Sequence, residues 1–235
     1  MAIQKDTFNG NGFGQSVGVL DTIRRNKVLR STYILLAISL IPTVFGAWLG
    51  MQLKVFAGMG AGMTAIIFLA GAFGLMFAIE KFKNSAVGVG LLLLFTFFMG
   101  VMLSRMLGAV LSFSNGPQLV MMAFGGTAAI FGVMSTIATV SKRDFSGMSK
   151  WLLIGALVIL VAGIANIWLQ LPALSLTISA MAMFIFSAFM LTDVQNVVNG
   201  GETNYVSATL SIYMNLYNVF SSLLSILGLT GGSRD

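Results

Sequence analysis

The sequence predicts an all-α integral membrane protein with seven transmembrane helices, the last of which lies at the centre of the bundle. Three observations support this prediction. Of the 235 residues, 57% are hydrophobic and only 9% are charged, and the mean hydropathy is +0.94, whereas a soluble domain has roughly 25% charged residues. The charged residues and turn signals divide the chain into seven apolar segments. The last of these segments carries a continuous polar face.

The first three spans are bounded by charged residues. Residues 31–53, 55–79 and 84–104 contain no charged side chain. Each is at least as long as the ~20 residues that a helix needs to cross a hydrocarbon core of about 30 Å. The apolar runs are continuous rather than alternating, which favours helices over a β-barrel. Glycine-rich stretches at residues 58–62 and 71–74 are expected to serve close helix packing.

Turn-forming residues divide the longer uncharged segments. Residues 112–118 (SFSNGPQ) have the composition of a turn and precede a fourth span at about 119–141. A fifth span near 151–169 is separated from a sixth near 173–194 by Pro172. Proline lacks an amide hydrogen and favours the start of a helix, so it ends one span and begins the next.

The basic residues indicate the orientation of the spans. With the N-terminus in the cytoplasm, most lysines and arginines fall on the cytoplasmic side, as the positive-inside rule expects. These are Lys5, Arg24, Arg25, Lys27, Arg30, Lys81, Lys83, Lys142, Arg143 and Lys150. This topology explains the net charge of +6 without a nucleic-acid partner.

The ends of the chain are expected to lie outside the bilayer. Residues 1–26 are polar and glycine-rich and lack the apolar core of a signal peptide, so we expect a flexible cytoplasmic tail there. Such a tail either offers a partner something to grip or has no function. Residues 27–229 then form the seven-helix domain, and residues 230–235 a short C-terminal tail.

The composition argues against catalysis. The chain has no His and no Cys, so the usual base of a serine nucleophile and the thiolate nucleophile are both missing. It contains no HExxH, phosphate-loop or GxSxG motif, and no span carries a pair of carboxylates. We therefore expect a non-enzymatic protein with no catalytic residue, no cofactor and no metal site.

Two charged residues lie within or close to the ends of spans. Asp193 follows the apolar run 179–191, and a carboxylate in a span is a functional candidate because an unpaired charge in lipid is costly. It is either a proton sensor or a side chain that simply reaches the cytoplasmic interface. Arg105 lies near the outer end of the third span, where an arginine side chain can extend toward the interface. Asp193 lies near the inner end of the sixth span, so the two residues belong at opposite faces of the membrane and should not pair.

The seventh span, residues 205–229, has the clearest pattern. Polar residues recur there at intervals of three and four, which places them on one face of a helix. They are Asn204, Ser207, Ser211, Asn215, Asn218, Ser222 and Ser225. This face cannot contact lipid, so we expect the helix to be central. The face serves either interhelical hydrogen bonding or a polar path with Asp193 at its inner end.

The C-terminal part of the chain closely resembles the Bax-inhibitor family, and two other stretches resemble its bacterial YccA-like branch. The family-like stretches are residues 191–195 (LTDVQ), 200–205 (GGETNY), 213–220 (YMNLYNVF) and 223–228 (LLSILG), together with Ala208. The stretches similar to the YccA branch are residues 27–33 (KVLRSTY) and 165–174 (ANIWLQLPAL).

The resemblance implies a seven-helix fold with a central last helix. It also implies two kinds of function. Proteins of the YccA branch bind the membrane-anchored, ATP-dependent protease FtsH and restrain its action on membrane substrates. Other family members form a proton-sensitive calcium leak, and eukaryotic relatives dampen cell death.

This sequence has only part of what the leak needs. In the members that form a leak, two aspartates on the last two spans share a proton-linked interaction, which an arginine on span two secures. Asp193 matches the first aspartate, but Asn215 stands at the second position, and residues 55–79 contain no arginine. Asp193, Asn215 and Asn218 remain the candidates for sensing protons or ions, although they would make a poor calcium site.

The sequence and the resemblance together lead to one main hypothesis. We expect a non-enzymatic modulator of FtsH in the bacterial inner membrane, with lipid as its surroundings and the protease as its partner. The alternative is a pH-sensitive leak for calcium or other cations. A third possibility is a structural membrane protein that aids stress tolerance indirectly.

Overall fold

The computed structural model describes residues 11–232, with side chains from Ile23 onward. Within this range it contains seven long α-helices, all of them long and apolar enough to cross a membrane, and one 3-10 turn, η1 (Ser146–Met148). The helices are α1 (Asn11–Gln52), α2 (Ala61–Phe82), α3 (Ala86–Leu111), α4 (Gly116–Val140), α5 (Ser149–Leu169), α6 (Pro172–Val198) and α7 (Tyr205–Gly231). The prediction of an all-α, seven-span protein is therefore confirmed.

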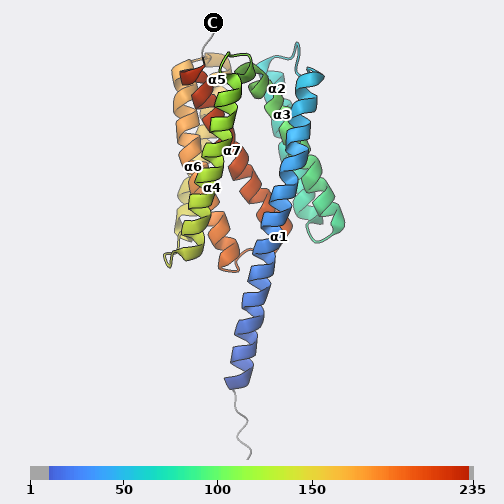
Figure 1. Ribbon diagram of the computed structural model, residues 1–235, viewed down its shortest axis with the longest axis vertical. Coiled ribbons are helices and arrows are strands. Elements are labelled where there is room, and N and C mark those ends of the chain that lie inside the picture. Colours follow the sequence, from blue (N-terminus) through green and yellow to red (C-terminus); the bar gives the residue numbers. More distant parts are fainter. Residues whose placement is uncertain (1–10, 233–235) are drawn as a thin grey trace, which may run out of the picture.

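The last helix is central. In Figure 1, α7 crosses the bundle obliquely, with α1, α2 and α3 on one side and α4, α5 and α6 on the other. It packs against α6, α4, α1, α3 and α2, whereas α5 packs mainly on α6 at the periphery. The buried core follows α7: Val206, Ile212, Val219 and Leu224 are each fully buried. A helix in contact with five others is where a polar face can be kept away from lipid.

Helix α1 begins earlier than predicted. The expected flexible tail covered residues 1–26, but the backbone is helical from Asn11, so that part of the prediction is wrong. Neither Gly nor Pro occurs between residues 19 and 41, so nothing ends the helix as it leaves the span. Residues 1–10 lie outside the described range, as do 233–235 of the predicted C-terminal tail.

Helix α2 begins later than predicted, at Ala61. The preceding segment turns through two residues with positive φ, Lys54 at 47° and Gly58 at 78°. Gly58 adopts this left-handed conformation without steric cost, which explains part of the glycine content of this stretch. Gly60 and Gly62 have open space around the position of a Cβ, so the expected close packing of residues 58–62 is wrong.

The closest helix packing joins α1 to α3 instead. A Cβ on Gly100 would collide with the backbone of Thr43, and a Cβ on Gly46 would collide with the carbonyl of Phe97. On α2, a Cβ on Gly71 would collide with the tip of the Phe98 ring. Small residues let membrane helices approach until their backbones touch, and van der Waals contact then replaces the hydrophobic effect as the main attraction.

Candidate functional site on the last two helices

Four chain segments lie at the same end of the bundle. The α2–α3 turn, the α4–α5 connection, the α6–α7 turn and the protruding part of α1 all lie at the lower end of Figure 1. Most of the basic residues belong to these segments: Arg24, Arg25, Lys27, Arg30, Lys81, Lys83, Lys142, Arg143 and Lys150. We refer to this as the basic end of the bundle. Asp193 lies on the last turns of α6, close to it.

Asp193 contacts the central helix directly. Its Oδ2 atom accepts a hydrogen bond of 2.7 Å from Nδ2 of Asn215, which is 5% exposed on α7. Asp193 itself is half-buried between the buried residues Thr192 and Val194. The structure therefore joins two of the three candidate sensing residues across the interface of α6 and α7.

The third candidate, Asn218, does not take part in this contact. Its Nδ2 donates to the carbonyl of Met214, one turn earlier on its own helix, at 2.8 Å. Arg105 lies at the other end of the bundle, where its Nη1 donates to Oγ1 of Thr64 at 3.0 Å. Asp193 and Arg105 are thus apart, as predicted.

The polar face of α7 is turned mostly inward. Ser207, Asn215 and Ser222 are buried, and Asn204, Asn218 and Ser225 are half-buried. Besides the contact of Asn215 with Asp193, the hydroxyl of Ser179 on α6 donates to that of Ser225 at 3.0 Å. These two bonds show the face serving interhelical hydrogen bonding with α6.

One residue of the face departs from the prediction. Ser211 is exposed, although all seven polar residues were expected to be sheltered. Because α7 crosses the bundle obliquely (Figure 1), its neighbours change along its length, and a stripe parallel to its axis does not stay under one of them. The periodicity of a single helix gives the direction of a side chain but not what lies opposite it.

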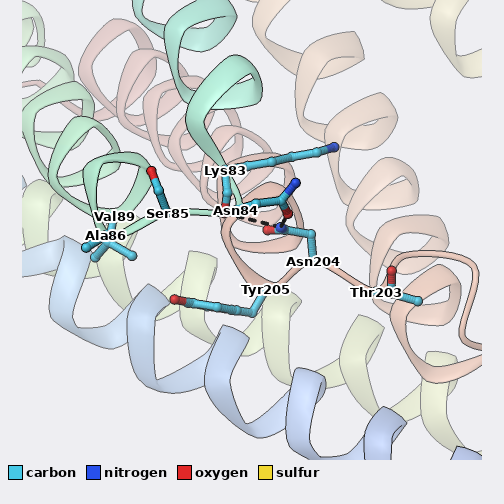
Figure 2. A pocket seen from close by; sticks show the side chains of 8 residues that line it. All are labelled: Lys83, Asn84, Ser85, Ala86, Val89, Thr203, Asn204 and Tyr205. Atoms are coloured by element: carbon cyan, nitrogen blue, oxygen red, sulfur yellow. Dashed lines mark hydrogen bonds between the residues drawn. The ribbon is translucent and has the colours of Figure 1, made fainter.

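Asn204 anchors the start of α7. Its Oδ1 accepts hydrogen bonds from the backbone amides of Val206, at 2.8 Å, and Ser207, at 3.3 Å, which caps the helix. Its Nδ2 donates to the backbone carbonyl of Lys83 and, at 2.8 Å, to Oδ1 of Asn84 (Figure 2). One side chain of the predicted polar face therefore fastens the central helix to the α2–α3 turn.

Sequence reasoning missed Gln195, which holds the α4–α5 connection. Its side chain is 4% exposed; Nε2 donates to the carbonyl of Arg143 at 2.7 Å, and Oε1 accepts from the amide of Phe145 at 2.8 Å. The signal that could have found it is an amide side chain two residues after Asp193, in the last turns of an apolar helix. A buried amide needs both donor and acceptor partners, and backbone of the neighbouring connection provides both.

It also missed a polar contact deep in the bundle. The hydroxyl of Tyr213, which is 1% exposed, lies 2.8 Å from Oγ1 of Thr43 on α1, and it is within 3.4 Å of the carbonyl of Thr96 on α3. The ring meets Phe95 edge-on at 6.0 Å between centroids. This contact joins three helices that are far apart in the sequence.

The contact between Asp193 and Asn215 offers few groups for catalysis or metal binding. The partner of Asp193 is an amide rather than a second carboxylate. Among residues 23–232, whose side chains the structure describes, no group of three acidic side chains stands together to hold a metal ion. The candidate site is a hydrogen-bonded contact between two helices, close to the connections at the basic end, and it suits positioning of the helices better than bond-making chemistry.

Comparison with known proteins agrees with the fold. Residues 25–232 match the family model described as Inhibitor of apoptosis-promoting Bax1. The chain is 41% identical to the Modulator of FtsH protease YccA of Escherichia coli K12, over 89% of this chain and 92% of that protein. It is 39% identical to an uncharacterised protein of Neisseria meningitidis serogroup A, over 88% and 92% of the two chains.

A further relative in Vibrio cholerae, described as an uncharacterised membrane protein, is 36% identical over 88% of this chain and 92% of its own length. The matches cover nearly all of the seven helices, so the similarity concerns the whole bundle. The chain is therefore a multi-pass membrane protein of the Bax-inhibitor family, and it is similar over most of its length to the bacterial protein YccA.

Proposed function

We propose that this protein is a non-enzymatic modulator of an FtsH-type membrane protease in the bacterial inner membrane, with its N-terminus in the cytoplasm. The observation that carries the proposal is the 41% identity to the E. coli protein named Modulator of FtsH protease, over 92% of that protein. A relative in another E. coli strain is named Inner membrane protein YccA, which supports the location.

The structure supports a role in binding rather than in chemistry. Asn215 and Ser225 on α7 are engaged in contacts with α6. The outer faces of α2, α4 and α5 are exposed and apolar, with Phe77, Met121 and Trp151 each at least 74% exposed. In a membrane such faces meet either lipid or the spans of another protein, and a lateral contact of that kind would suit a modulator of a membrane-anchored protease.

Co-purification with the protease tests the first half of the proposal. The protein is expressed with FtsH whose proteolytic site has been inactivated, so that FtsH can bind this protein without degrading it. We expect FtsH to be retained with the tagged protein after solubilisation in mild detergent. An unrelated seven-span membrane protein expressed at the same level is the control, and equal retention by that control would contradict the proposal.

Degradation of a membrane substrate tests the second half. Active FtsH and a test membrane substrate are reconstituted in liposomes with increasing amounts of this protein. We expect the half-life of the substrate to lengthen with the amount added, while ATP hydrolysis by the protease continues. An unchanged half-life at a molar excess of this protein would end the proposal.

The alternative of a cation leak gains no support from the contacts of its candidate residues. A proton-linked pair requires two carboxyl groups that interact. The carboxyl group of Asp193 is instead bound to the amide of Asn215. We therefore put forward the protease modulator alone.

A further inference from the structure

The basic end of the bundle carries its densest group of cations on α1. Arg24, Arg25, Lys27 and Arg30 fall within seven residues, and each of them is exposed. In Figure 1 this part of α1 runs on past the ends of the other helices. The contact of Asp193 with Asn215 is made elsewhere, on α6 and α7, so these cations need another explanation.

Only one side of this segment faces the bundle. The side chain of Arg25 lies beside Gly200 of the α6–α7 turn, where a Cβ on the glycine would be 2.8 Å from Nε. Leu36 lies on the same side of α1, three turns further on, and is 4% exposed. At about 100° per residue, Lys27 and Arg30 lie roughly 150° around the helix from Arg25. These two cations therefore face away from the bundle, and we call them the outer cationic pair.

The same face of α1 becomes apolar further along the helix. Ile34, Ile38 and Ile41 follow Arg30 at intervals of four, four and three residues, so they share one face with the outer cationic pair. They are 50%, 44% and 69% exposed, respectively. This face therefore presents two positive charges at one end and three apolar side chains beyond them, in the direction of the membrane core.

The length of α1 places the outer cationic pair at the level of the lipid headgroups. Residues 31–52 of the helix carry no charge, and at about 1.5 Å per residue they cross the ~30 Å hydrocarbon core. Arg30 then lies at the boundary of the core, and Lys27 lies about 4.5 Å beyond it. The contact of Arg25 with Gly200, just after α6 ends at Val198, indicates the same level.

The described part of the chain supplies no carboxylate to this pair. Among the side chains from Ile23 onward, the one ion pair joins Lys83 to Glu80. The other described carboxylates accept hydrogen bonds from groups outside α1, and they belong to Asp144, Asp193 and Glu202. In the sequence, Asp21 is the only acidic residue between residues 7 and 79, and four cations follow it by residue 30, so this segment has a net charge of +3. The pair is open to an anion from outside the chain.

We propose that the outer face of α1 binds an anionic phospholipid such as phosphatidylglycerol. Its phosphate would lie between Lys27 and Arg30, and an acyl chain would run along Ile34, Ile38 and Ile41. Clusters of basic residues directly beside a transmembrane span are typical sites for anionic headgroups. The apolar continuation of the face favours a lipid, because a free phosphate or an acidic peptide would use only the cations. The proposal does not rest on the protease function.

Quenching by brominated lipids measures which lipid occupies this face. The chain has no cysteine, so Ile34→Cys provides a single site for a fluorescent label. Phe184→Cys is the control, on an exposed position of α6, a helix without a basic residue. The full protein is placed in nanodiscs of phosphatidylglycerol and phosphatidylcholine, with bromine on the acyl chains of one or the other. We expect phosphatidylglycerol to quench more strongly than phosphatidylcholine at residue 34 and equally at residue 184. The same ratio at both positions would overturn the proposal.

Two matched double variants locate the headgroup. Lys27→Gln with Arg30→Gln removes the outer cationic pair, whereas Lys142→Gln with Lys150→Gln removes two exposed cations elsewhere at the basic end. We expect the preference for phosphatidylglycerol at residue 34 to be lost in the first and kept in the second. Lys27→Gln alone should weaken the preference about fivefold, which corresponds to the ~1 kcal/mol expected of one basic residue near an anionic surface. Equal losses in the two double variants would mean that the general positive charge of this end holds the lipid, and the assignment to α1 would be wrong.

Two water-soluble anions identify the kind of ligand. Inorganic phosphate and polyglutamate are each added at the ionic strength of a chloride control, so that screening by salt is equal. We expect neither to change the ratio, and a loss of the preference with either one alone would overturn the lipid assignment. Size-exclusion elution and Tm are measured for every variant. If the double variant at Lys27 and Arg30 folded poorly, Lys27→Gln alone would decide the outcome, because it changes one exposed side chain.

Discussion

Helices α5 and α7 are both long enough to span a membrane, yet they lie in opposite environments. α5 has the most apolar segment of the seven helices, and α7 has the least apolar one. Of those segments, 6% of α5 is buried inside the bundle, compared with 33% of α7. Ile159 is the buried residue of α5, whereas Tyr213, Asn215 and Ser222 are among the many of α7. Of these two helices, the more polar one is the more central.

The difference reflects the surrounding solvent. In water, apolar residues are buried because the removal of apolar surface from water is favourable. In a bilayer, lipid tails are as apolar as leucine, so an apolar helix gains little by moving inward, while a polar group gains a partner. The central position of α7 therefore follows its polar residues.

The two helices also differ in how they bind their common neighbour, α6. In α5, Nδ2 of Asn166 donates to Oγ of Ser175 at 2.6 Å, close to the α5–α6 turn. In α7, Nδ2 of Asn215 donates to a carboxyl oxygen of Asp193 at 2.7 Å, and this asparagine is buried. The same side chain thus makes a peripheral contact in one helix and a central contact in the other.

The largest expected effect is on packing around α7. Tyr213→Ala removes a fully buried ring and its contact with Thr43, and we expect it to lower the free energy of unfolding by about 3–5 kcal/mol. Trp168→Ala in α5 removes a ring that is 73% exposed, so it should change stability by less than about 1 kcal/mol. Unfolding in mixed detergent micelles measures both. Equal losses would show that the two helices are equally important to the core.

Glycine substitutions extend the comparison to helix contacts. Gly100→Ala on α3 would bring a methyl group within 2.8 Å of the carbonyl carbon of Thr43 on α1, so we expect a loss of about 1–3 kcal/mol. Gly163→Ala on α5 has open space around it and should cost nothing. Thermal unfolding in detergent distinguishes the two. A stable Gly100→Ala protein would mean that α1 and α3 can separate without loss.

The two asparagines allow a sharper test. Asn215→Ala leaves the carboxyl group of Asp193 without its amide donor inside the bundle, and we expect a loss of about 1–3 kcal/mol. Asn166→Ala should cost only about 0.6 kcal/mol, because water near the turn can replace the amide. Both are measured by unfolding, with Asn215→Ala combined with Asp193→Ala as a double-mutant cycle. A coupling energy of zero in that cycle would contradict the importance of the contact.

The smallest expected loss of stability is in the α4–α5 connection. The backbone amide of Ser146 donates to Asp144 at 2.8 Å and its hydroxyl lies 3.0 Å from the same carboxylate; both bonds hold the pKa of Asp144 below its ordinary value of 3.8. Because the folded-state pKa is the lower one, this carboxylate contributes stability above the ordinary pKa, and the contribution is lost as the pH falls through the folded value.

The Tm difference between the wild type and Asp144→Asn measures this effect. We expect a small advantage of the wild type at pH 7 that shrinks below pH 3.8. Asp144 is fully exposed, so the advantage should be smaller than the losses expected for Tyr213→Ala, Gly100→Ala and Asn215→Ala. A difference that stays constant with pH would show that the carboxylate does not act through its charge.

Much of the fold could be predicted from the sequence. Continuous apolar runs between charged residues gave the number of spans, because a helix must satisfy its own backbone in lipid. The ends of the helices were less predictable. Helix α1 continues beyond its apolar run to Asn11, and helix α2 begins only after the turn that contains Gly58 and Gly60.

For the candidate site, the sequence predicted only on which face of its helix each side chain lies. Helical spacing placed Asn215 and Ser225 on one face of α7, and both contact α6. Spacing could not show that Ser211 is exposed or that Gln195 reaches the α4–α5 connection, because both depend on which helix lies opposite.

By itself, the sequence determined the membrane class, the seven helices and the central position of the last one. Each of these depends on local composition and on the period of a single helix, both of which can be read along the chain. Only the tertiary structure decided that Asp193 meets Asn215, that α1 and α3 touch through Gly46 and Gly100, and that a pocket opens beside Lys83. These features join residues that are distant in the sequence, and their geometry is set by how whole helices tilt and pack.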